Sequence, residues 1–162
     1  LHISTVYTFI TCNRGLRRLY SFTFIKLICI NMTIDEIQII IDKAYPKIQD
    51  HYNKKYGETS NLDIPKIEMH KDIYARLSGD EEQSGEHSDT SEAQYDDEAN
   101  VIYIYYPNMM NKEHVIRSII HEYTHYKQDH TLFSKYKAMY DYDEDPTEAA
   151  AKKNEEDWHL FI

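Results

Sequence analysis

The chain of 162 residues contains few cysteines, few glycines and few basic residues. Its two cysteines, Cys12 and Cys29, both lie within the first 31 residues, so the rest of the chain cannot contain a disulfide framework. With 18 Lys and Arg against 28 Asp and Glu, the net charge is −10, and no basic patch stands out. Nucleic acid is therefore not expected as the main partner, because proteins that bind it concentrate positive charge on one face.

Long apolar runs are also missing. Residues 22–30 come closest, with a basic run before them, but Lys26 interrupts the run, no small-residue cleavage site follows, and it is too short to span a bilayer. We therefore expect no membrane partner and an intracellular setting, which would be the host cytoplasm or the virion if the source is viral. Low glycine with abundant Ile, Asn, Lys and Tyr is compatible with the AT-rich genome of a phage or virus.

The first 31 residues differ in composition from the rest. Four basic residues and no acidic residue give them a charge of +4, namely Arg14, Arg17, Arg18 and Lys26. Met32 stands directly before the first well-capped helix pattern. We expect Met32 to be the native start, residues 1–31 to be a non-native or poorly ordered extension, and residues 32–162 to form a single domain.

Residues 33–56 have the pattern of an amphipathic helix. Thr33 and Glu36 have the spacing of a capping box at its start. Apolar residues then recur at helical spacing: Ile34, Ile37, Ile41, Ala44, Tyr45, Ile48 and Tyr52. We expect Pro46 to kink or split this helix.

Two segments downstream are typical of strands. Residues 100–106 are β-branched and aromatic, apolar on both faces, and closed by Pro107. Residues 64–70 form a weaker strand, and residues 72–77 either extend it or form a third. Between them, residues 78–98 are acidic and almost empty of large apolar side chains, which predicts a flexible loop that covers a cleft or is an inert insertion. This order of elements indicates an α+β fold.

The most informative motif is the run His121-Glu122-Tyr123-Thr124-His125. On a helix, residues four apart share one face, so the imidazoles of His121 and His125 can reach the same Zn²⁺, with Glu122 on the side where a reacting water lies. The neighbouring residues form the apolar stripe of a buried helix: Val115, Ile116, Ile119, Ile120 and Tyr123. The alternative is an accidental motif on a helix that binds other proteins.

A metal site needs a third ligand, and Glu148 is the candidate. Asp145 and Pro146 have the residue types of an N-cap and a first helical position, so Glu148 falls in the first turn of a new helix. Glu148 shares a face with Ala151 and Trp158, and the alanines that follow it permit close approach to another element. The same spacing from Asp145 also fits a capping box, in which the Glu148 carboxylate turns back to the N-cap N–H.

With HEYTH followed by Glu148 on a separate helix, residues 101–158 resemble the gluzincin branch of the zinc metallopeptidases. The resemblance is especially to the small single-domain forms of phages, viruses and prokaryotes. It implies a minimal zincin-like α+β fold, with an N-terminal helix, a two- to three-stranded sheet, the HExxH helix and a C-terminal helix that carries the third ligand.

Two other zinc-binding patterns fit the chain less well. The metzincin pattern is disfavoured because Gln128 and Thr131 stand where that branch has a glycine and a histidine. A SprT-like protease would use a histidine as the third ligand, and His159 or His130 would have to supply it.

The resemblance implies a hydrolase that cleaves peptides or proteins with Zn²⁺ held by His121, His125 and Glu148. Glu122 would be the general base for a metal-activated water. We expect a monomer with a peptide or protein substrate. A second hypothesis is a zincin-fold module that binds metal or protein without turnover.

Two further roles follow from the same resemblance. A donor for the developing oxyanion is expected from residues 133–142, which contain Tyr136, Tyr140 and Tyr142. The strand that contains Tyr103 and Tyr105 would be the sheet edge that pairs with an extended substrate. Its composition also fits an ordinary core strand.

Overall fold

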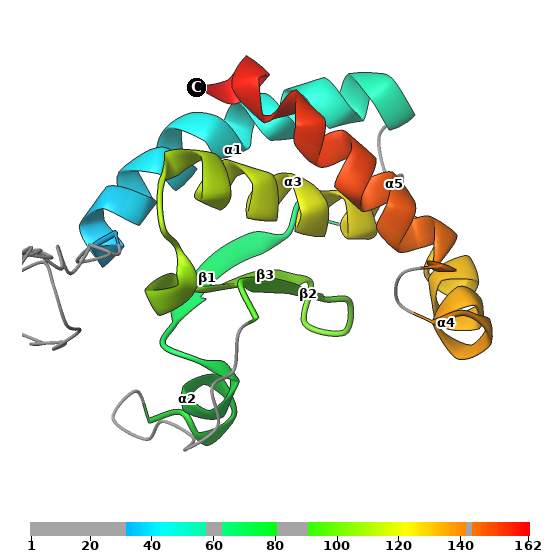
Figure 1. The fold of residues 1–162 in the computed structure, drawn as a ribbon, viewed down its shortest axis with the longest axis horizontal. Helices are drawn as coiled ribbons and strands as arrows, with labels where there is room; N and C mark the ends of the chain where they lie inside the picture. The colour runs from blue at the N-terminus through cyan, green and yellow to red at the C-terminus, as the bar shows by residue number, and fades with distance from the viewer. Residues whose placement is uncertain (1–31, 58–62, 81–90, 142–143) are drawn as a thin grey trace, which may run out of the picture.

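The computed structural model of the protein describes residues 32–57, 63–80, 91–141 and 144–162 (Figure 1). The predicted extension over residues 1–31 lies outside these described residues. Helices and a three-stranded sheet make up the described part, which confirms the predicted α+β class.

Helix α1 spans Ile34–Tyr56 and begins as predicted. The Thr33 hydroxyl accepts a hydrogen bond from the Glu36 backbone N–H at 3.3 Å, and the Glu36 carboxylate accepts from the Thr33 N–H at 2.9 Å. This reciprocal capping box satisfies two of the N–H groups that a helix start leaves open. The helix continues through Pro46, so the predicted split does not occur.

The sheet has the strand order β1-β3-β2. Strand β1 (Lys66–His70) is parallel to β3 (Val101–Tyr105), and β2 (Ala93–Asp96) is antiparallel to β3. Strand β3 therefore lies in the middle, and β2 lies at one edge of the described sheet.

The prediction that Tyr103 and Tyr105 belong to the edge strand is wrong. Both lie on β3, which is hydrogen-bonded to a neighbour on each side. Four of the five β3 residues are buried, and a strand covered on both faces is expected to be apolar on both faces. The alternative interpretation of this segment, an ordinary core strand, is correct.

Two expectations for residues 72–98 also need correction. Residues Ile73–Ser78 form a short helix, α2, and not a strand, because the Asp72 side chain accepts from the Ala75 N–H at 2.7 Å and caps its start. Strand β2 lies within residues 78–98, where a continuous loop is predicted, and residues 81–90 lie outside the described part.

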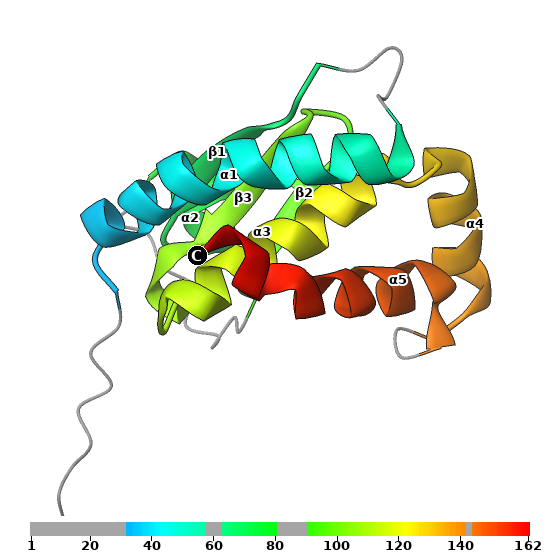
Figure 2. The same cartoon turned by 90° about the horizontal axis from the view of Figure 1, so that it is seen from above.

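Helix α3 (Lys112–Lys127) occupies the centre of the fold. Figure 1 shows it between the sheet and an outer layer formed by α1 and α5 (Pro146–Glu155), and in Figure 2 it lies between those two helices. A 3₁₀ segment, η3 (Glu156–Phe161), continues α5, and α4 (His130–Met139) lies where α3 ends and α5 begins. A short 3₁₀ turn, η1 (Tyr106–Asn108), follows β3. Among the described helices, none has the length and hydrophobicity that crossing a bilayer requires.

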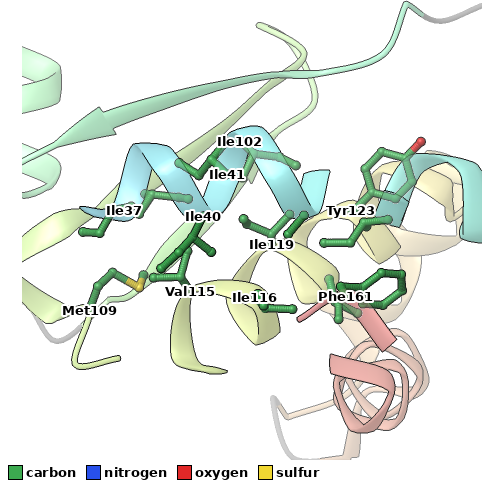
Figure 3. Close-up of a cluster of buried hydrophobic side chains, with 14 of the residues drawn as sticks. Ile37, Ile40, Ile41, Ile102, Met109, Val115, Ile116, Ile119, Tyr123 and Phe161 are labelled. Carbon is green, nitrogen blue, oxygen red and sulfur yellow. The ribbon is translucent and has the colours of Figure 1, made fainter. Parts of the chain in front are cut away.

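The hydrophobic core lies between α1, α3 and the sheet (Figure 3). One face of α1 and the matching face of α3 supply most of its side chains, and Ile102 of β3 and Phe161 of η3 complete it. The labelled members are Ile37, Ile40, Ile41, Ile102, Met109, Val115, Ile116, Ile119, Tyr123 and Phe161. This core holds α3 rigidly, so any side chains on its other face are held in place as well.

The contribution of this core can be tested on α1 with two isoleucines. Ile37 is fully buried, whereas Ile39 is 52% exposed. We expect Ile37→Ala to lower the free energy of unfolding by about 2–5 kcal/mol, because it removes buried methyl groups and leaves a cavity. The matched change Ile39→Ala is expected to alter it by less than about 0.5 kcal/mol. Urea denaturation of both variants measures the difference, and equal effects would contradict this packing.

Candidate metal centre

Helix α3 brings the two histidines of the motif together. The Asn111 side chain accepts from the His114 N–H at 3.0 Å and starts the helix, and no proline interrupts it before Lys127. His121 and His125 therefore lie on one face, with their Nε2 atoms 3.0 Å apart. His125 is buried and His121 is nearly so.

Helix α5 brings Glu148 to the same point. Asp145 caps the helix by accepting from the Thr147 N–H at 2.8 Å, so the Glu148 carboxylate is not needed for capping. Its Oε2 lies 3.3 Å from His121 Nε2, and its Oε1 lies 3.3 Å from His125 Nε2. The Glu148 carboxylate is therefore directed at the imidazoles of His121 and His125 and does not form the capping box that its spacing from Asp145 also allowed.

Contacts between α3 and α5 hold this arrangement in place. Ala151, one turn after Glu148 on the inward face, is fully buried, and its small side chain lets the helices approach closely. Asn154 donates to the Thr124 hydroxyl at 3.0 Å, and that hydroxyl donates to the Ile120 carbonyl at 2.8 Å. These buried bonds fix the register in which Glu148 faces the two histidines.

One ligand atom from each of His121, His125 and Glu148 lies within 4.8 Å of the others, close enough for the three to share one metal ion. Zinc bound at about 2.0–2.1 Å by nitrogen and oxygen separates its ligand atoms by roughly 3.4 Å. Here the two Nε2 atoms are 3.0 Å apart, and each lies 3.3 Å from a different oxygen of Glu148: Oε2 for His121 and Oε1 for His125. His121, His125 and Glu148 could therefore hold a metal ion, and two nitrogens with one oxygen suit zinc.

In the metal-free cluster, a proton on His121 supplies the positive charge. Burial lowers the pKa of His121, but its contacts with the Glu148 and Glu155 carboxylates outweigh burial and raise it to about 10. Burial likewise raises the pKa of Glu148, and the contacts with His121 and His125 reverse the direction and hold it well below its usual range. The metal-free site is therefore an imidazolium–carboxylate pair at neutral pH.

Glu122 is buried beside the cluster. Its Oε2 accepts a hydrogen bond from the backbone N–H of Tyr95 on β2 at 2.7 Å. Burial raises the pKa of Glu122, and the charges of His121 and His125 offset this only in part. A buried carboxylate with a raised pKa suits the role of a general base better than a solvated one.

Two residues that the sequence analysis did not single out contact the outer nitrogens of the histidines. Glu155 Oε1 lies 2.7 Å from His121 Nδ1, and Gln128 Oε1 lies 2.9 Å from His125 Nδ1. Such contacts orient metal-binding imidazoles. A signal for Glu155 was present in the sequence, because it follows Glu148 by two helical turns and shares its face.

A pocket of about 520 Å³ opens beside His121 and Glu122. Helix α3, α5 and the start of β2 form its walls. The lining residues are Ser91, Glu92, Ala93, His114, Arg117, Ser118, His121, Glu122, Lys152 and Glu155. All except Ala93 are polar, so the pocket suits a ligand rich in hydrogen-bonding groups.

The predicted oxyanion donors are not placed at this cluster. Tyr136 and Tyr140 pack against each other on α4 with ring centroids 5.8 Å apart, and neither lines the pocket. Tyr142 lies outside the described residues.

The candidates for a histidine third ligand are not placed there either. His159 is exposed, and its Nδ1 lies 2.9 Å from the Glu156 carbonyl on η3. The side chain of His130 is outside the described part.

Comparison of the chain with protein-family models, with curated proteins and with solved structures finds no match.

Removal of one ligand tests the candidate site. We expect the purified protein to bind one zinc ion and His125→Ala to lose it, because two ligands cannot replace three around a tetrahedral ion. His159→Ala, which changes an exposed histidine away from the cluster, is the matched control and should bind zinc normally. Equilibrium dialysis with elemental analysis gives the stoichiometry, and equal zinc contents of the two variants would contradict the assignment.

Zinc affinity should depend on pH through His121. Its pKa in the metal-free protein is raised from 6.5 to about 10, so the ring is protonated at neutral pH and zinc must displace the proton. The affinity is therefore expected to increase by up to tenfold per pH unit between about pH 6.5 and 8.5. Chelator competition, corrected for the protonation of the chelator, measures this slope. An affinity that is independent of pH would show that no proton is displaced.

Proposed function

We propose that the protein is a zinc-dependent metallopeptidase. The observation that carries the proposal is the convergence of one ligand atom each from His121, His125 and Glu148 to within 4.8 Å of one another, next to the buried carboxylate of Glu122. Three nitrogen and oxygen ligands with a neighbouring base are the parts that hydrolytic zinc sites use.

Metal binding and proton transfer are assigned to different residues of the site. His121, His125 and Glu148 hold the ion, which when bound supplies Lewis acidity that brings the pKa of water toward neutrality. Glu122 takes a proton from the attacking water on its carboxylate and delivers it to the nitrogen of the departing amine as the amide bond breaks. The Tyr95 N–H holds Oε2 of Glu122 in place, which leaves Oε1 for the proton transfer.

Strand β2 is the proposed binding edge for an extended peptide. It lies at an edge of the described sheet, packs against α3, and begins at Ala93 in the wall of the pocket that Glu122 also lines. Extended peptides commonly bind by adding a strand to such an edge. This assignment replaces the one that placed the substrate along Tyr103 and Tyr105.

The substitution Glu122→Gln, which replaces one carboxylate oxygen with an NH₂ group, tests the mechanism. We expect Glu122→Gln to bind zinc as the wild type does but to lower the rate of cleavage of a mixed peptide library about 10²–10⁴-fold, because an amide cannot accept the proton. Glu156→Gln, at an exposed position on η3, is the matched control and should cleave normally.

The outcomes separate the hypotheses. Equal cleavage by wild type and Glu122→Gln rejects the role of Glu122. Zinc binding by the wild type with no cleavage of the library or of casein supports the module that binds metal without turnover. If the wild type neither binds zinc nor cleaves peptides, the HExxH motif is accidental and α3 serves only in packing.

A further inference from the structure

Gln128 lies between two of the three ligands. It is the C-cap of α3, three residues after His125, and its backbone N–H donates to the carbonyls of Thr124 and His125. Its side chain reaches across to α5, where Nε2 donates to the Thr147 carbonyl at 2.9 Å. Thr147 directly precedes Glu148. The side-chain amide of Gln128 therefore connects His125 with the residue before Glu148.

The contact with Thr147 fixes the orientation of the Gln128 amide. A carbonyl oxygen only accepts hydrogen bonds, so the atom that faces Thr147 must be the NH₂ group. The atom 2.9 Å from His125 Nδ1 is then Oε1, which also only accepts. His125 must therefore carry its proton on Nδ1, and this assignment follows from the bonding partners and not from visible hydrogens.

The tautomer decides which nitrogen of His125 can bind a metal. With the proton on Nδ1, a neutral His125 directs the Nε2 lone pair at His121 Nε2, 3.0 Å away, and at Glu148 Oε1, 3.3 Å away. Glu155 holds His121 Nδ1 in the same way. Once the Nε2 proton of His121 is lost, two lone pairs and the Glu148 carboxylate face one another at these distances and repel unless a cation lies between them.

We infer that Gln128 is a positioning residue for metal binding, which holds His125 in the Nδ1–H tautomer and aligns its ring with Glu148. The inference rests on the proposed zinc site and does not depend on peptide hydrolysis. A purely structural role, in which Gln128 only ties α5 to α3 through Thr147, is the competing explanation.

Two substitutions separate these roles. Gln128→Glu keeps an acceptor for His125 Nδ1–H but cannot donate to the Thr147 carbonyl at neutral pH. Gln128→Met has a similar length and provides neither. If Gln128 positions His125, the zinc dissociation constant of Gln128→Met should rise about 10–100-fold, as is typical when the partner of a metal-binding histidine is removed, while Gln128→Glu stays close to wild type.

Chelator competition for zinc is the main measurement, and the absorption spectrum of the Co²⁺-loaded protein is the second. A band shift in Gln128→Met but not in Gln128→Glu reports a change at the coordinating ring itself. Gln38→Met, an exposed glutamine on α1, is the matched control and should leave both unchanged. Circular dichroism and thermal melting of the metal-free variants establish that each one folds.

The results decide between the explanations. Equal zinc affinity of Gln128→Met and the wild type overturns the inference. An equal loss in Gln128→Met and Gln128→Glu assigns Gln128 to helix docking and also overturns it. If the wild type itself takes up no zinc, the metal site fails first, which is distinct from a failure of Gln128 to position His125.

Discussion

The docking of α5 onto α3 is the interaction on which the candidate site depends. His121 and His125 come from one helix, and their relative position follows from helical geometry alone. Glu148 comes from a different helix, and only the interface around Ala151, Asn154 and Thr124 brings it to 3.3 Å from both rings. The buried hydrogen bond between Asn154 and Thr124 favours this register, because sliding either helix would break it.

Helix α3 has two faces with different functions. Its apolar face packs against α1 and the sheet, and this packing provides the burial that stabilises the fold. The other face carries His121, Glu122 and His125 towards α5 and β2. Buried polar groups are stable only when they have hydrogen-bond partners, and each of the three has one: Glu155, the Tyr95 N–H and Gln128.

Much of this arrangement was predictable from the chain, and the reasons differ from one element to the next. Helix α1 and the helix start at Asp145 follow from local capping signals, which act over three or four residues. His121 and His125 follow from a spacing within one helix. The place of β3 in the sheet did not follow, because strand order depends on partners distant in sequence, although its apolar composition already favoured the centre.

Other features could not be predicted from the sequence, for a physical reason. Strand β2 is only four residues long and lies in an acidic, polar segment, so it has no apolar alternation to reveal it. It forms because β3 offers backbone partners. The contact between Gln128 and Thr147 joins two helix ends across a loop, and no local pattern encodes such a bond. The tyrosines of α4 were expected at the site from the resemblance alone, and in a chain with 15 tyrosines most are packing residues.

The hydrogen bond from the Tyr95 N–H to Glu122 ties the proposed general base to an edge strand of the described sheet. A four-residue strand at an edge of the described sheet can detach at a much lower free energy than the one that opens the core. Detachment would free the Glu122 carboxylate while leaving the helices intact. On warming, the site would then lose its arrangement at temperatures where the helical content has not yet begun to fall. Loss of the proposed activity and loss of the fold would be two separate transitions.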